Sequence, residues 1–312
     1  MPAQILKPTG EAIALACDIL RQGGLVGLPT ETVYGLAADA SNPAAIARLY
    51  AAKGRPAFNP LIAHVESTDM ARQIGVFPRP ALTMAQAFWP GPLTMVVQAM
   101  ADCPVCDLAR AGLETVALRQ PAHPAARRVL SQFGGAIAAP SANPSGQVSP
   151  TSAEHVAADM ADAVDLILDG GPSMAGIEST IIDARFDTPT LLRPGSIDTE
   201  QIEAVWPGLI HAASDPKAPR SPGQSQRHYA PTNPIRLNVT APQGGENFLA
   251  FGAMDGTANL SAGADLVEAA ANLFHMLRAL DKMGQPIAVA PIPNHGVGEA
   301  INDRLNRAAQ ID

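Results

Sequence analysis

The chain has 312 residues, of which 47% are hydrophobic and only 4% aromatic, and its formal net charge is −8. This length is sufficient for one large domain and a smaller one. The acidic balance argues against a general nucleic-acid coat, because binding a phosphate backbone depends on excess Lys and Arg. The sequence contains no apolar run long enough to span a bilayer and no signal-like N-terminus, so we expect a soluble, cytoplasmic protein.

Helical spacing of apolar residues and capping residues at the expected starts predict the helices. In chain order they cover residues 11–21, 43–52, 68–74, 80–88, 124–133, 266–283 and 299–310. Asn42 and Pro43 illustrate the signal, since a cap residue precedes a proline at the first helical position. Thr151 and Glu154 have the spacing of a capping box at a further helix start.

Short apolar or β-branched runs, several ended by Pro or Gly, predict the strands. In chain order they cover residues 25–28, 61–65, 93–98, 115–119, 136–139, 166–168, 181–183, 191–193, 235–239, 248–251 and 287–290. Frequent short strands interspersed with helices favour a mixed α/β sheet over a simple doubly wound one. Residues 212–234, rich in Pro, Ser, Gly and charge, have the composition of a linker.

The three cysteines are too few for a disulfide framework. Cys103 and Cys106 form a Cys-x-x-Cys pair, but a zinc site would need a second pair that Cys17 alone cannot supply. Because the pair does not open a helix after a strand, as a redox motif would, we interpret both as reduced thiols in a loop.

Two cations, Lys53 and Arg55, flank Gly54 on a loop between a predicted helix and a predicted strand. If the loop is extended, side chains two residues apart point the same way, and the glycine lets a ligand approach the backbone. An Arg fork and a Lys point charge could then clamp phosphate oxygens. The alternative is a helix C-terminus that carries favourable cations.

Polar residues also follow or end several predicted strands. Thr30, Glu31 and Thr32 follow the strand over 25–28, at the kind of position where α/β proteins bind ligands. In the strand over 115–119, alternation places Arg119 on the same face as Ala117, which leaves room for an anion or for an acidic partner on the sheet. His64, at a strand end, could equally be a packed residue. The loop over 141–146 could contact a ligand or hydrogen-bond its own turn.

Several longer motifs occur in a fixed order along the chain. They are PTETVYGL (29–36), KGRP (53–56), NPL (59–61) followed by His64, TVALRQPAHP (115–124), APSANPSG (139–146), ESTIID (178–183), LLRPG (191–195) and SPGQSQRHYAP (221–231). This ordered set resembles the Sua5/YrdC/YciO family, and its spread over most of the chain makes it far more specific than any single short pattern. The residues that follow LLRPG resemble those of the longer, Sua5-type members.

The resemblance implies an α/β fold with two domains. Residues 1–211 would form a YrdC-like twisted mixed sheet with helices around a large basic cavity. Residues 212–234 would be a linker that acts as a lid over the active site. Residues 235–312 would be a small, Rossmann-like, three-layer α/β domain of the Sua5 type.

The resemblance also implies L-threonylcarbamoyladenylate synthase activity. L-threonine, bicarbonate and ATP would give threonylcarbamoyl-AMP and pyrophosphate, for the N6-threonylcarbamoyladenosine (t6A) modification of tRNA. ATP would be a substrate, with Mg²⁺ bound to it and no direct protein ligand for the metal. The downstream tRNA threonylcarbamoyltransferase machinery would receive the product, and we expect no direct binding of tRNA and no membrane partner.

The family's site residues carry over by motif position. The expected ATP contacts are Lys53, Arg55, Asn59, Thr115, Ser141, Asn143, Ser149, Arg193 and Tyr229. The expected threonine contacts are Thr32, His64, Arg119, Ala139 and Ser179. Lys53 and Arg55 are the expected catalytic residues, because nucleotidyl transfer depends on positioning and charge stabilisation rather than on a side-chain nucleophile.

This sequence departs from the family pattern in two places. Gln224, Ser225 and Gln226 replace the usual residues of the lid, and Ala122 stands where the family has an acidic residue. The first departure concerns how the lid lies over the site, and the second makes the helix start beside Arg119 less charged.

Two other functions are compatible with this family. One is an RNA-binding module, which the acidic charge and the lack of an aromatic-basic pattern argue against. Strong, salt-sensitive tRNA binding would support it. The other is a related carbamoyl- or acyl-adenylating enzyme with a different acceptor.

From the sequence we predict that Lys53→Ala or Arg55→Ala nearly abolishes turnover and leaves the fold intact, because exposed loop cations contribute little to stability. Pyrophosphate release and thermal unfolding measure the two effects. Loss of folding in place of activity would contradict the phosphate-clamp interpretation.

Overall fold

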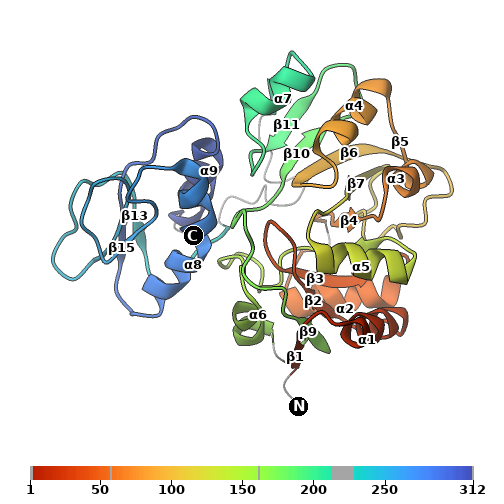
Figure 1. The fold of residues 1–312 in the computed structure, drawn as a ribbon, viewed down its shortest axis with the longest axis horizontal. Helices are drawn as coiled ribbons and strands as arrows, with labels where there is room; N and C mark the ends of the chain where they lie inside the picture. Colours follow the sequence, from red (N-terminus) through yellow and green to blue (C-terminus); the bar gives the residue numbers. More distant parts are fainter. Residues whose placement is uncertain (1–2, 57, 161, 213–227, 311–312) are drawn as a thin grey trace.

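The computed structural model describes residues 3–56, 58–160, 162–212 and 228–310, which form two regions, each built on its own sheet (Figure 1). We call residues 3–212 the larger region and residues 228–310 the smaller region. Most of the expected linker, including its unusual Gln224 to Gln226 segment, lies outside the described residues. No helix in the described part of the chain is long and apolar enough to cross a membrane.

The sheet of the larger region is mixed and twisted. Its strands lie in the order β1-β9-β2-β3-β8-β4-β7-β6-β10-β11-β12, and β5 pairs with β6. They are β1 (Gln4–Leu6), β2 (Val26–Leu28), β3 (Gly35–Asp39), β4 (Ile62–His64), β5 (Gly75–Val76), β6 (Leu93–Ala99), β7 (Thr115–Arg119), β8 (Ile137–Ala138), β9 (Leu166–Leu168), β10 (Thr180–Asp183), β11 (Thr190–Arg193) and β12 (Ile210–His211). Parallel pairs such as β4–β7 adjoin antiparallel pairs such as β6–β7, so the prediction of a mixed sheet is confirmed.

The helices of the larger region begin largely where capping residues predict. They are α1 (Gly10–Arg21), α2 (Pro43–Lys53), α3 (Thr68–Ile74), α4 (Arg79–Phe88), α5 (Pro124–Phe133), α6 (Ala153–Met160) and α7 (Thr199–Val205). The side chain of Asn42 accepts hydrogen bonds from the first turn of α2. The capping box predicted at Thr151 is wrong, because the Ser152 hydroxyl takes the bond from the His155 N–H.

The larger sheet buries different residues on its two faces, as alternation requires. Val97 of β6 and Leu118 of β7 belong to the main core, which the helices cover. On the opposite face, a small apolar cluster consists of Ile62, Val96, Ala117, Ile181 and Leu192. We call this cluster the apolar floor.

The smaller region contains a parallel sheet in the order β13-β16-β14-β15. Its elements are β13 (Ile235–Arg236), β14 (Asn247–Ala250), β15 (Ala258–Asn259), α8 (Leu266–Asp281), β16 (Ile287–Val289) and α9 (Gly298–Ala308). Figure 1 shows α8 and α9 between this sheet and the larger region.

The two regions are packed together through apolar, ionic and backbone contacts. Val33, Val148 and Ile177 of the larger region share one core with the smaller region. Arg278 of α8 forms an ion pair of 2.5 Å with Asp159 of α6. The described parts of the two regions therefore share one buried interface.

Gly176 lies against the backbone of α8. Its φ is +69°, and a Cβ there would lie 2.4 Å from the carbonyl oxygen of Ala271. We predict that Gly176→Ala lowers the free energy of unfolding by more than the cost of a left-handed non-glycine residue alone, which is about 1–2 kcal/mol. The melting temperature should fall accordingly. Gly284→Ala is the matched control, because Gly284 has a similar φ of +73° and open space around it. Equal effects in thermal unfolding would contradict the close approach.

Candidate active site

A hollow of about 560 Å³, open solvent at its mouth included, lies beside the apolar floor residue Ile62. Its lining includes the predicted site residues Thr32, Arg55, His64, Arg119, Ala139, Ser141, Ser179, Arg193 and Tyr229, together with Thr30, Val33, Gly35, Ile62, Pro140, Glu178 and His228. Residues predicted from motifs far apart in the sequence therefore meet around one cavity.

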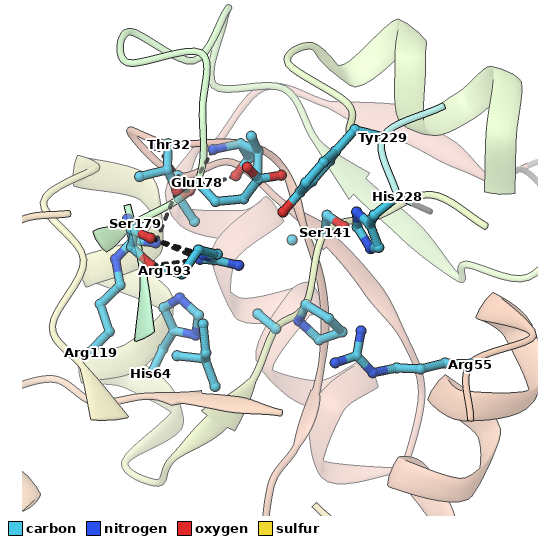
Figure 2. A pocket seen from close by; sticks show the side chains of 16 residues that line it. Thr32, Arg55, His64, Arg119, Ser141, Glu178, Ser179, Arg193, His228 and Tyr229 are labelled. Atoms are coloured by element: carbon cyan, nitrogen blue, oxygen red, sulfur yellow. Dashed lines mark hydrogen bonds between the residues drawn. The ribbon is translucent and has the colours of Figure 1, made fainter. Parts of the chain in front are cut away.

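Strand pairing brings the polar side chains to this hollow. His64 and Arg119 end the parallel strands β4 and β7 and are direct partners in register. Ser179 immediately precedes β10, and Arg193 ends its antiparallel neighbour β11. Figure 2 shows Arg119 and His64 on one side of the hollow and Arg55, His228 and Tyr229 on the other.

Arg119 is both paired with an acid and part of the lining, so the two sequence-based alternatives hold together. Its guanidinium donates to Glu31 Oε1 at 2.6 Å, to Thr32 Oγ1 at 2.9 Å and to the Gly91 carbonyl at 3.2 Å. Burial alone would raise the pKa of Glu31, but the charge and hydrogen bond of Arg119 outweigh it and lower that pKa. Glu31 offsets the charge of Arg119 in a place that water hardly reaches.

His64 lies beside Arg119 and is neutral. Burial and the charge of Arg119 lower the pKa of His64 to about 3. Its Nδ1 is buried without a hydrogen-bond partner among the described residues. A neutral imidazole can offer a donor or an acceptor to a ligand without adding a second positive charge.

Arg193 holds Ser179 in place. Its Nη2 donates to the Ser179 carbonyl at 2.9 Å and to the Ser179 hydroxyl at 3.2 Å. The Ser179 hydroxyl also forms a hydrogen bond of 2.8 Å with Thr94 Oγ1. Burial lowers the pKa of Arg193, yet an arginine stays charged at neutral pH.

The Lys53-Gly54-Arg55 loop differs from the sequence-based expectation. Gly54 is left-handed, with φ 58° and ψ 32°, so the loop is not extended. Arg55 lines the hollow and donates to the carbonyls of Asn59 and Pro60 at 3.2 and 2.9 Å. The premise that these cations are exposed is wrong, since Lys53 is 3% and Arg55 9% exposed.

Lys53 instead supports the loop that carries Ser141. Its Nζ donates to the carbonyls of Ser141 and Asn143 at 2.5 Å each. Burial, and secondarily the charge of Arg55, lower the pKa of Lys53 well below its ordinary value. Removing the ammonium would leave two carbonyls without their donor, so Lys53→Ala should reduce stability as well as activity.

His228 and Tyr229 close the side of the hollow opposite Arg119. Tyr229 is 1% exposed, has a φ of +62° and stacks on Phe274 of α8 with ring centroids 5.5 Å apart. Its hydroxyl, which Figure 2 shows pointing into the hollow, has no partner among the described residues. Burial lowers the pKa of His228 and raises that of Tyr229.

The other predicted residues do not line the hollow. Asn59 and Asn143 are buried behind it, where their carbonyls accept hydrogen bonds from Arg55 and Lys53. Ser149 is also buried, and its hydroxyl donates to Glu178 at 2.6 Å. Thr115 begins β7, about 13 Å along the strand from Arg119, and lies apart from the hollow.

Glu31, Glu178 and His228 belong to the site but were not among the predicted contacts. Glu178 lines the hollow and connects Ser149 to Arg304 of the smaller region. The available signal was the motifs themselves, because each of the three lies inside one of the ordered family motifs.

Within the described chain, buried polar side-chain atoms without partners occur at three residues that line the hollow and at three that do not. Among the described residues they are Asn59 Oδ1, His64 Nδ1, Asn143 Oδ1, His228 Nδ1, Tyr229 OH and Arg304 Nη2. An unsatisfied buried polar atom costs about 1–3 kcal/mol, so a group of them needs an explanation. A polar ligand in the hollow would explain the atoms of His64, His228 and Tyr229, which line it. The described residues contain no cluster of three or more His, Cys, Asp or Glu that could hold a metal ion.

Comparison with known proteins accounts for nearly the whole chain. The Sua5, YciO and YrdC family model, described as "Telomere recombination", matches residues 18–195. The model described as "Threonylcarbamoyl-AMP synthase, C-terminal domain" matches residues 197–310. The chain is 41% identical to the threonylcarbamoyl-AMP synthase of Bacillus subtilis, over 97% of this chain and 94% of the relative.

Solved structures are similar over the same span. Pyrococcus abyssi Sua5 complexed with L-threonine has a TM-score of 0.90 and 36% identity, covering 99% of this chain and 98% of that one. A second P. abyssi Sua5 structure, in which a histidine and the tyrosine that follows it are replaced by alanine, has a TM-score of 0.89 and 34% identity, covering 98% and 96%.

The neutral state of His64 predicts a pH dependence of stability. An unfolded histidine titrates near 6.5, whereas His64 titrates at about 3 in the folded chain. Between these values the unfolded chain binds a proton that the folded chain does not, so the unfolding free energy falls as the pH falls. We expect His64→Gln to reduce this slope by up to about 1.4 kcal/mol per pH unit. Denaturant unfolding at several pH values measures it, and an unchanged slope would contradict a buried, neutral His64.

Proposed function

Since the chain belongs to the Sua5/YrdC/YciO family as a Sua5-type threonylcarbamoyl-AMP synthase, we propose that the hollow binds ATP and L-threonine side by side. The enzyme makes threonylcarbamoyl-AMP and pyrophosphate from L-threonine, bicarbonate and ATP. The observation that carries the site assignment is the arrangement of Arg119, Arg193 and Arg55 around one cavity.

Threonine binds at the Arg119 end. Arg119 has five N–H donors, and the hydrogen bonds to Gly91, Thr32 and Glu31 use three of them, which leaves two for the threonine carboxylate. The unpartnered His64 Nδ1 is available to a polar group of the amino acid. The lining residues Thr32, Ala139 and Ser179 complete this end. The threonine complex of the P. abyssi relative supports the assignment.

ATP binds at the Arg55 end. Arg55, Ser141, Arg193 and Tyr229 contact the nucleotide, because they line the hollow on the side away from the Arg119–Glu31 pair or between the two ends. Lys53, Asn59, Asn143 and Ser149 act from behind by holding these contacts in place. Thr115 stays outside the proposed site.

The chemistry needs no side-chain nucleophile. The amine of threonine and bicarbonate form a carbamate with loss of water, and a carbamate oxygen then attacks the α-phosphorus of ATP while pyrophosphate leaves. The arginines hold the two substrates in line and stabilise the charge on the phosphates. Mg²⁺, when bound to the triphosphate, would neutralise part of that charge. Glu178 is the carboxylate in the lining of the hollow that could contact such a metal ion. Both of its oxygens already accept hydrogen bonds, from Ser149 and from Arg304.

His228 and Tyr229 are the described end of the lid over ATP. They belong to the 212–234 segment and are its first residues after the undescribed stretch, and the Tyr229 hydroxyl has no hydrogen-bond partner among the described residues. A histidine and the tyrosine after it were replaced by alanine in one P. abyssi Sua5 structure, and residues 228–229 are the only adjacent His-Tyr pair in this sequence.

The proposed site assigns a role to each part of the chain. Residues 1–211 form the catalytic domain, 212–234 the linker and lid, and 235–312 the Rossmann-like C-terminal domain. The labile product passes in the cytoplasm to the tRNA threonylcarbamoyltransferase machinery, for t6A formation.

The two ends can be separated by kinetics. We predict that Arg119→Gln raises the KM for threonine about tenfold or more and changes the KM for ATP less than threefold, whereas Arg55→Gln does the reverse. Each loss corresponds to one or two charge-assisted hydrogen bonds, about 1.5–3 kcal/mol. Pyrophosphate release with ATP, bicarbonate and each amino acid in turn measures both.

Arg119→Lys is the matched control, because it keeps a cation opposite Glu31 and therefore spares the fold. Pyrophosphate release that ignores threonine would overturn the specificity. Equal effects of Arg119→Gln and Arg55→Gln on both substrates would overturn the division of the hollow.

A further inference from the structure

Arg304 belongs to the smaller region, yet most of its partners belong to the active-site wall. It lies on α9 and is among the largest side chains in the described chain with no exposed surface. A completely buried guanidinium needs several partners, because removing a charge from water is costly. The identity of those partners shows what the side chain holds together.

Two segments of the larger region, at Glu178 and Pro194, and the lid residue Tyr229 contact Arg304. Its Nε donates to Glu178 Oε2 at 3.1 Å, and its Nη1 donates to the Pro194 carbonyl at 2.6 Å. Its guanidinium carbon lies 5.3 Å from the centroid of the Tyr229 ring, a cation–π distance. Glu178 and Tyr229 line the hollow, and Pro194 directly follows Arg193.

Glu178 transmits this contact to the proposed ATP end. Its Oε1 accepts a hydrogen bond of 2.6 Å from Ser149 while Arg304 holds its Oε2. A carboxylate in the wall of a triphosphate site would repel the ligand unless a cation offset its charge. Asp303 also pairs with Arg304, at 3.0 Å.

We propose that Arg304 is a positioning residue of the synthase, which neutralises Glu178 and holds it, with Tyr229, in the geometry that ATP requires. It acts through these residues and does not touch the reacting atoms. Helix α9 thereby completes the ATP end of a site whose other contacts come from the larger region and from His228 and Tyr229. This inference rests on the proposed ATP site.

A merely structural Arg304 would show a different pattern. Removing one partner of a buried ion pair destabilises a protein, whatever the pair does. Stability alone is therefore not informative. The KM for each substrate is informative, and so is the recovery of that KM when the charge of Glu178 is removed, because both depend on the electrostatic field inside the hollow.

The experiment compares Arg304→Met, Glu178→Gln, the double variant and Arg304→Lys with the full-length wild type. Pyrophosphate release gives the KM for ATP, the KM for threonine and kcat, and calorimetry gives the binding of ATP alone. Arg236→Met is the matched control, since Arg236 pairs with Glu246 inside the smaller region, at 2.6 Å.

We expect Arg304→Met to raise the KM for ATP about tenfold or more and the KM for threonine less than threefold. Glu178→Gln in the same chain should recover most of the ATP affinity, because the uncompensated charge is gone. Arg304→Lys should fall between Arg304→Met and wild type, and Arg236→Met should leave both KM values unchanged.

Two results would overturn the proposal: an Arg304→Met variant with a lower melting temperature and an unchanged KM for ATP, or a double variant no better than Arg304→Met. Should Arg304→Met fail to fold, Arg304→Lys and the double variant decide, and wild-type KM for ATP in Arg304→Lys would refute the positioning role. If Arg55→Gln also leaves ATP binding unchanged, the ATP site itself is misplaced, which is a separate failure.

Discussion

The active site depends on arginine side chains that are buried and nevertheless charged. Arg119 donates to Glu31 and Thr32, Arg55 donates to two carbonyls, and Arg304 is held by Glu178. Each arrangement offsets the cost of removing a guanidinium from water and fixes its direction. Such preorganised charge suits a reaction in which alignment and electrostatic stabilisation do most of the work.

Compensating acids give the hollow two different ends. Glu31 offsets Arg119 at the proposed threonine end, where one carboxylate and one ammonium would be bound. At the other end, Arg55 donates to the carbonyls of Asn59 and Pro60 and has no carboxylate partner among its described hydrogen bonds. Its charge is therefore available to a triphosphate, while Glu178 is occupied by Ser149 and Arg304. The distribution of acids thus matches the charges of the two substrates.

The same physics relates the two regions of the chain. Arg278 and Arg304 both reach from helices of the smaller region to the larger one. Arg278 also donates to the Ser149 carbonyl at 3.2 Å. The Ser149 hydroxyl donates to Glu178, which Arg304 holds, so both arginines support this serine. A sheet that lies far from the chemistry is connected to it by these few charged side chains.

Local signals in the sequence determined the elements whose stability is local. Asn42 capped α2, alternation in β7 assigned Arg119 to one face, and the ordered motifs identified the family and most of the residues around the hollow. The strand β3 was missed, because Gly35 to Asp39 lacks β-branched residues and becomes a strand by pairing with β2 and β8. Only the tertiary structure decided that Lys53 donates to carbonyls 88 and 90 residues later in the chain. It also brought Arg304 to Glu178 across 126 residues. Partners so distant leave no periodicity in the sequence, since a buried charge is satisfied by whatever group the fold places beside it.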